Sequence, residues 1–86
     1  MFTPEEIHER VRQQPFVPLR IVTSAGLIFD VHHPELIMIG RRALEIGYPS
    51  VENPRTFDRV IRVAIMHVNT IEELPVQASP EGNGQQ

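Results

Sequence analysis

The sequence contains no cysteine, no tryptophan and no lysine. Without cysteine the chain has no disulfide and no thiolate ligand for a metal. With 86 residues it makes one small domain, and a domain of this size buries only about 60% of the surface of its unfolded chain. Small domains are usually stabilised by disulfides, by a metal or by self-association. We therefore expect this chain to form a homo-oligomer.

The sequence also lacks a long apolar run. No stretch approaches the roughly 18 apolar residues of a membrane-spanning helix, and the N-terminal residues lack the basic and apolar regions of a signal peptide. We expect a cytoplasmic protein with no membrane partner. The net charge of −3 gives no electrostatic support for a general nucleic-acid binder. All eight basic residues are arginines, which suit bidentate contacts with phosphate or carboxylate groups.

Catalytic motifs are missing as well. The chain has no nucleophile elbow, no glycine-rich phosphate loop and no HExxH sequence, so we expect no enzyme and no cofactor. The one set of metal-like residues is His32, His33, His67 and Glu35. Neighbouring residues of a strand point to opposite faces, so the adjacent histidines could bind one ion only at a bend. We expect them to hydrogen-bond to turn backbone and to hold no metal.

The N-terminal segment carries a helix start signal. Thr3 suits the N-cap, a proline follows at the first helical position, and Glu6 completes a capping box. Pro15 ends the helix because the residue before a proline disfavours helical geometry. Only Ile7 and Val11 form an apolar stripe, so the helix is expected to lean on a sheet.

The first hairpin has a register that can be predicted. A three-residue loop at 24–26 with Gly26 in the left-handed conformation is a common hairpin solution. It makes one face almost wholly apolar, with Phe29 in the core, and places Arg20 opposite Asp30 on the other face. The predicted opposite pairs are Leu19 and Val31, Arg20 and Asp30, Ile21 and Phe29, Val22 and Ile28, and Thr23 and Leu27.

A second hairpin is predicted within residues 36–48, and its register stays open. A two-residue loop at 41–42 pairs Ile39 with Leu44, but it places bulky residues at turn positions that favour positive φ. A three-residue loop instead brings Met38 onto the same face as Leu44. The pattern favours neither strongly.

The remaining segments complete an α+β fold. A polar loop at 49–58 precedes a strand at 59–64, and a last short strand is expected at 68–72. The ordered domain is predicted to span residues 1–74, with a disordered tail at 75–86. The fold is an N-terminal helix packed on a small, strongly bent antiparallel β-sheet or barrel of about five strands.

Arg41 and Arg42 are the most exposed positive feature, because they lie at a predicted hairpin tip. Such a pair is usually a solvated turn; the functional interpretation is a contact with a phosphate or an acidic partner. Arg20 and Arg59 each have a carboxylate neighbour in the predicted strands. Arg62 is therefore grouped with the arginine pair as a candidate ligand contact.

Four short motifs spread over nearly the whole chain outside the tail. They are Pro15-Phe16-x-Pro18-Leu19-Arg20, Val31-x-His33-Pro34-Glu35, Gly40-Arg41-Arg42 and His67-Val68-x-x-Ile71-Glu72. Together they resemble a family of small uncharacterised bacterial proteins common in planctomycetes. This resemblance implies no activity.

The element order resembles a second family. A helix, a strand that runs into Gly26, a bent sheet and a tight turn near His67 before the last strand are similar to an Sm-like barrel, above all the Hfq-type RNA chaperone. An SH3-like barrel has a comparable shape. The Sm resemblance implies RNA as a ligand and His67 as a residue near the uridine site, although Met66 stands where that family has lysine.

Two functions follow as hypotheses. The first is a non-enzymatic, self-associating module with RNA as candidate ligand, bound by Arg41, Arg42, Arg62 and His67. The alternative is a protein-interaction or structural subunit of a larger bacterial assembly that binds no nucleic acid. In both cases the strand at 59–64 and the last strand are the expected edges between copies, with a ring as one arrangement.

Overall fold

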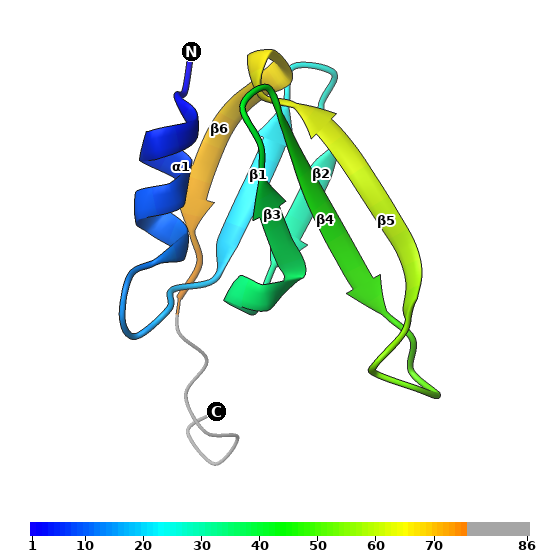
Figure 1. Ribbon diagram of the computed structural model, residues 1–86. Helices are drawn as coiled ribbons and strands as arrows, with labels where there is room; N and C mark the ends of the chain where they lie inside the picture. The colour runs from blue at the N-terminus through cyan, green and yellow to red at the C-terminus, as the bar shows by residue number, and fades with distance from the viewer. Residues whose placement is uncertain (76–86) are drawn as a thin grey trace, which may run out of the picture.

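A computed structural model describes residues 1–75 as one α-helix and two three-stranded antiparallel sheets (Figure 1). The elements in chain order are α1 (Pro4–Val11), β1 (Leu19–Thr23), β2 (Ile28–Val31), the 3-10 turn η1 (Pro34–Leu36), β3 (Ile37–Ile39), β4 (Ala43–Pro49), β5 (Phe57–Ala64), the 3-10 turn η2 (Ile65–His67) and β6 (Val68–Glu73). The strand orders are β2-β1-β6 and β3-β4-β5. The predicted disordered tail, Pro75 apart, lies outside the described residues.

The predicted helix start is confirmed. The Thr3 hydroxyl accepts a hydrogen bond from the Glu6 backbone N–H (3.1 Å), and the Glu6 carboxylate accepts one from the Thr3 N–H (2.9 Å). The helix ends at Val11, with Arg12 as its C-cap. Ile7 is fully buried and anchors the helix to the strands. No helix within residues 1–75 has the length and apolar character needed to cross a bilayer.

The register of the first hairpin is confirmed as well. Gly26 has φ +86°, and the paired residues of β1 and β2 are those predicted. The Arg20 guanidinium donates two hydrogen bonds, of 2.8 and 3.0 Å, to the Asp30 carboxylate. One detail differs, because Phe29 is only partly buried and packs against the core from its rim.

The second hairpin adopts the two-residue loop. Ile39 lies opposite Leu44, and Met38 is 64% exposed, so the three-residue alternative is wrong. The argument against the shorter loop does not hold, because neither Arg41 nor Arg42 has positive φ. A two-residue turn can therefore carry two bulky residues here without left-handed backbone.

The expectation of one strongly bent sheet or barrel of about five strands needs correction. The described residues form six strands in two separate sheets, which do not close into a barrel. Pro34 and η1 separate β2 from β3, and a proline cannot continue the hydrogen-bond ladder of a central strand. The chain returns to the first sheet at β6, where Ile71 lies opposite Ile21.

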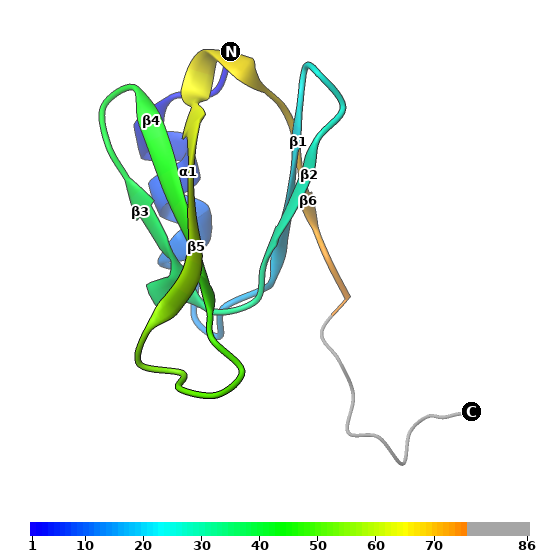
Figure 2. The same ribbon diagram turned by 90° about the vertical axis from the view of Figure 1, so that its right-hand side faces the viewer.

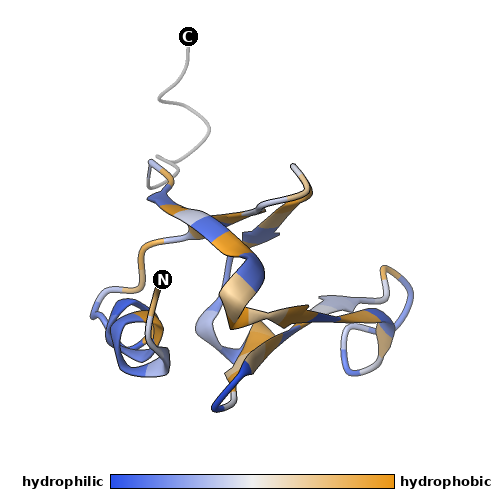
Figure 3. Ribbon diagram, turned by 90° about the horizontal axis from the view of Figure 1, so that it is seen from above, coloured by the Kyte–Doolittle hydropathy of each residue, from blue (hydrophilic) through white to orange (hydrophobic). Residues whose placement is uncertain are grey.

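The core lies between the two sheets, and α1 covers one of their open sides (Figures 1 and 2). Figure 3 shows a largely hydrophilic helix whose apolar side faces the strands. The buried core residues are Ile7, Ile21, Val31, Ile37, Leu44, Ile46, Val63, Ile65 and Val68. The helix lies beside β6 and β3, the edge strands of the two sheets. The other two edge strands, β2 and β5, flank the opposite side, which α1 does not reach.

Candidate functional site

The side of the molecule away from the helix holds an apolar groove between the first hairpin and β5. Its volume is about 360 Å³, and we call it the intersheet groove. It is lined by Thr23, Ser24, Ala25, Leu27, Phe29, Ile61, Arg62, Val63, Ala64 and His67. The first hairpin and β5 border this groove from two different sheets and do not pair with each other.

The two strands that border this groove carry exposed apolar residues. In the described part of the chain, β5 pairs only with β4, and β2 pairs only with β1. Ile28 on β2 is 58% exposed and Val60 on β5 is 60% exposed. Phe57, the first residue of β5, is also half-exposed. A free strand edge beside exposed apolar residues is a template for pairing with another chain.

The four predicted ligand-binding residues are not gathered into one site. Arg62 and His67 both line the intersheet groove. Arg42 lies at the same end of the molecule as η2, since its carbonyl accepts a hydrogen bond from the Ile65 N–H (2.7 Å). Arg41 lies on the helix side, in a shallow groove that α1 lines with residues such as Glu5 and Glu9. Arg41 thus lies beside the helix, whereas Arg42 contacts η2 through its backbone.

His67 is held by the loop of the first hairpin. Its carbonyl accepts a hydrogen bond from the Ser24 N–H (2.8 Å), and its ring nitrogen Nδ1 lies 3.5 Å from the Ser24 hydroxyl. Both side chains are exposed. No group of three histidine, cysteine or acidic side chains within residues 1–75 is placed to hold a metal ion.

The reason for separating Arg62 from Arg59 was wrong. Arg62 forms an ion pair with Glu45 (2.8 Å), which lies directly opposite it on β4. Arg59 makes no ion pair with Asp58 in this structure; its guanidinium lies over the Tyr48 ring, 5.4 Å from the centroid. Adjacent strand residues point to opposite faces, so cross-strand neighbours decide these contacts. Burial raises the pKa of the Tyr48 hydroxyl.

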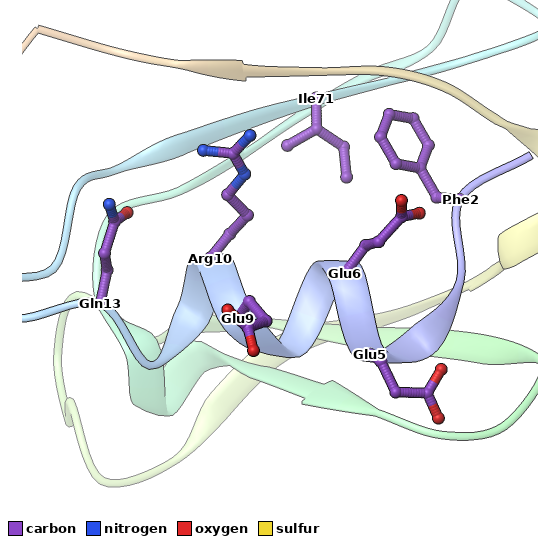
Figure 4. Close-up of a pocket in the computed structure, with 7 residues that line it drawn as sticks. All are labelled: Phe2, Glu5, Glu6, Glu9, Arg10, Gln13 and Ile71. Carbon is purple, nitrogen blue, oxygen red and sulfur yellow. The ribbon is translucent and has the colours of Figure 1, made fainter.

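A second groove lies between α1 and β6 (Figure 4) and was not predicted. Its volume is about 560 Å³, and its lining residues are Phe2, Glu5, Glu6, Glu9, Arg10, Gln13 and Ile71. The three carboxylates would repel phosphate. The Arg10 guanidinium reaches Glu73 of β6 (2.6 Å), so the helix is tied to this strand by an ion pair. The helix α1 therefore lies beside the outer edge of β6, with this groove between them.

Comparisons of the chain with protein-family models, with curated proteins and with solved structures gave no match.

Proposed function

We propose that this chain is a non-enzymatic module that self-associates and binds other proteins through its open side, the side that carries β5 and the intersheet groove. The observation that carries this proposal is the free edge of β5. This strand has eight residues and, within residues 1–75, pairs with β4 alone. It presents Phe57 and Val60 to solvent. Such an edge gains backbone hydrogen bonds and buries apolar surface when a second strand is added.

The charge distribution supports a protein partner over RNA. The net charge is −3, and three of the eight basic side chains, Arg10, Arg20 and Arg62, already form ion pairs with acidic residues of the same chain. The apolar lining of the intersheet groove suits aliphatic or aromatic side chains of a partner.

Sedimentation velocity over a wide range of protein concentration tests the proposal. We expect an assembly larger than a monomer that dissociates on dilution. Val60→Lys puts a charge on the free edge and should dissociate the assembly, because inserted charges block edge pairing. The matched control is Val51→Lys, a still more exposed valine in the loop before β5, which should behave as wild type. A monomer at every concentration, or an unaffected Val60→Lys variant, would overturn the proposal.

RNA binding is the second candidate, within an Sm-like interpretation of the fold. The order of elements supports it: a helix, a hairpin, a break, three further strands, a 3-10 turn and a last strand beside the first. The turn with Arg42 and the 3-10 turn with His67 lie at one end of the molecule, joined through Ile65. The Sm resemblance assigns His67 to the ligand site, and the exposed hairpin tip makes Arg42 a candidate phosphate contact beside it.

A titration of labelled oligo-uridine tests this second function. Binding should weaken with added salt, since each neutralised phosphate releases counterions. Arg41→Ala/Arg42→Ala should abolish the shift. A control with the same loss of charge is Arg55→Ala/Arg59→Ala, near the end of β5 that lies away from η2, which should bind like wild type. Equal binding by all three proteins, or no binding by wild type, would exclude RNA binding through this site. Protein interaction would then be the remaining proposal.

A further inference from the structure

The free edge of β5 carries a pattern of residues that is complementary to itself. Two identical antiparallel strands in one sheet are related by a two-fold axis perpendicular to the sheet. This axis keeps the inner faces of the two sheets on the same side, and residues directly opposite each other also share a face. Because neighbouring residues of a strand face opposite sides, the axis must lie at a residue that is opposite its own copy. In the regular part of β5 the candidates are Arg59, Val60, Ile61 and Arg62.

The charged residues that would face each other differ among these four registers, and they favour one of them. An axis at Arg59 or at Arg62 places an arginine opposite the same arginine of the second copy, and like charges directly opposite are destabilising. An axis at Ile61 forms no opposite-charge pair, because Asp58 then faces an alanine. An axis at Val60 places Asp58 opposite the partner's Arg62, and the symmetry repeats that pair.

The side chains concerned are available for this arrangement. The register of β4 and β5 shifts between Tyr48 and Pro49, so Asp58 is the extra residue of a β-bulge and lies opposite no residue of β4. Its side chain is exposed and makes no ion pair with any residue in the described range, so it can turn toward a strand added at this edge. The Arg62 side chain is 72% exposed and uses one terminal nitrogen, Nη1, for Glu45. The exposed Val60 would be covered by its own copy at the axis.

We infer that two copies of this chain associate by antiparallel pairing of β5 with β5 about a two-fold axis at Val60, with Asp58 of each copy facing the partner's Arg62. This inference rests on the proposed self-association and names its surface and register. The second copy is the favoured occupant because β5 carries both members of the ion pair, Asp58 and Arg62, that its own antiparallel copy would complete. The outer edge of β6, by contrast, already has α1 beside it, with Arg10 bound to Glu73.

A charge-reversal mixing experiment tests the register. Asp58→Arg places two arginines opposite each other, and Arg62→Asp places two aspartates opposite each other. For each variant alone, the dissociation constant of the dimer should rise about tenfold or more above that of wild type. An equimolar mixture should recover the association. In the mixed dimer, the arginine introduced at position 58 of one chain faces the aspartate introduced at position 62 of the other. The native Asp58 and the native Arg62 face each other in the second pair, so both pairs are again complementary.

The matched controls carry equal charge changes outside β5. They are Glu52→Arg and Arg55→Asp, both in the loop before the strand, and each should associate like wild type. Circular dichroism checks that every variant is folded. Association of wild type that neither variant weakens, or weakened variants that do not recover on mixing, would overturn the register but leave self-association standing. A wild-type protein that is monomeric at every concentration would overturn both.

Discussion

The ring of Phe57 lies directly on Gly47: a β-carbon built at position 47 would come within 2.8 Å of the ring. Gly47 is a buried residue of β4, and Phe57 begins β5. Because Gly47 has no side chain, the Phe57 ring can lie against the backbone of β4. This contact holds the start of β5 against β4, although half of the phenylalanine is exposed.

Gly47→Ala should therefore displace the ring. We predict a loss of about 1 to 3 kcal/mol in the free energy of unfolding, the range for overpacking, measured by urea denaturation. In a Phe57→Ala background the same substitution should cost little, because the ring that the methyl group meets is gone. Equal costs in both backgrounds would show that the contact does not matter.

The two residues of one cross-strand pair should differ in what their truncation costs. Ile21 is fully buried, whereas Phe29 opposite it is partly exposed at the intersheet groove. Ile21→Ala should cost about 2 to 5 kcal/mol. Phe29→Ala should cost less than Ile21→Ala, although phenylalanine is the larger residue, because part of its side chain stays in contact with water. The check is urea denaturation of both variants; a larger loss for Phe29→Ala would mean that the groove is closed in solution.

The stability that Asp30 provides should depend on pH. Hydrogen bonds from Arg20 lower the pKa of the Asp30 carboxyl below its ordinary value. A carboxyl with a lowered folded-state pKa stabilises the fold above its unfolded pKa, about 4, and loses this effect as the pH falls through the folded pKa. The gap in unfolding free energy between wild type and Asp30→Asn should thus be widest near neutral pH and shrink below about pH 4.

Urea denaturation at a series of pH values measures that gap. Arg20→Met removes both the positive charge and the hydrogen-bond donor, so in this background the effect of Asp30→Asn on the free energy of unfolding should lose its pH dependence. A gap that is constant from neutral pH into the acid range would contradict the assignment.

The capping box offers a comparison of two adjacent glutamates. Glu6 accepts the Thr3 N–H, while Glu5 has no part in the box. Thr3→Ala should destabilise the protein by about 1 kcal/mol, and Glu6→Ala should be costlier than Glu5→Ala, since only Glu6 satisfies an unpaired backbone donor. Melting curves of the three variants measure this order. Equal melting temperatures for the two glutamate variants would show that the box contributes nothing beyond the helix dipole.

Local signals predicted the parts of the fold that local contacts determine. The helix start and the first hairpin were predictable because Thr3, Gly26 and the Arg20–Asp30 pair act within a few residues or across one tight loop. The second hairpin was ambiguous because its arginine turn has no glycine that requires a particular conformation. The number of sheets was missed because Pro34 interrupts what a pattern of apolar runs presents as one bent surface.

The candidate site depended on contacts between distant segments. The intersheet groove lies between the first hairpin and β5, which do not pair with each other, and no periodicity within either segment reports that they border one groove. Glu45 and Arg62 could be matched only once the β4–β5 register was known. The sequence indicated short apolar strands and an edge at 59–64, but it carried no sign that the helix would lie beside the other predicted edge, the last strand.

The central claim is that a second chain adds to the free edge of β5. Amide hydrogen exchange, followed by mass spectrometry at low and high protein concentration, tests it most directly, because new backbone hydrogen bonds slow exchange at the strand that forms them. The account predicts that exchange slows with concentration in β5, over Phe57–Ala64, and stays unchanged in β6, over Val68–Glu73. Slowing in β6, or no change in β5, would contradict it.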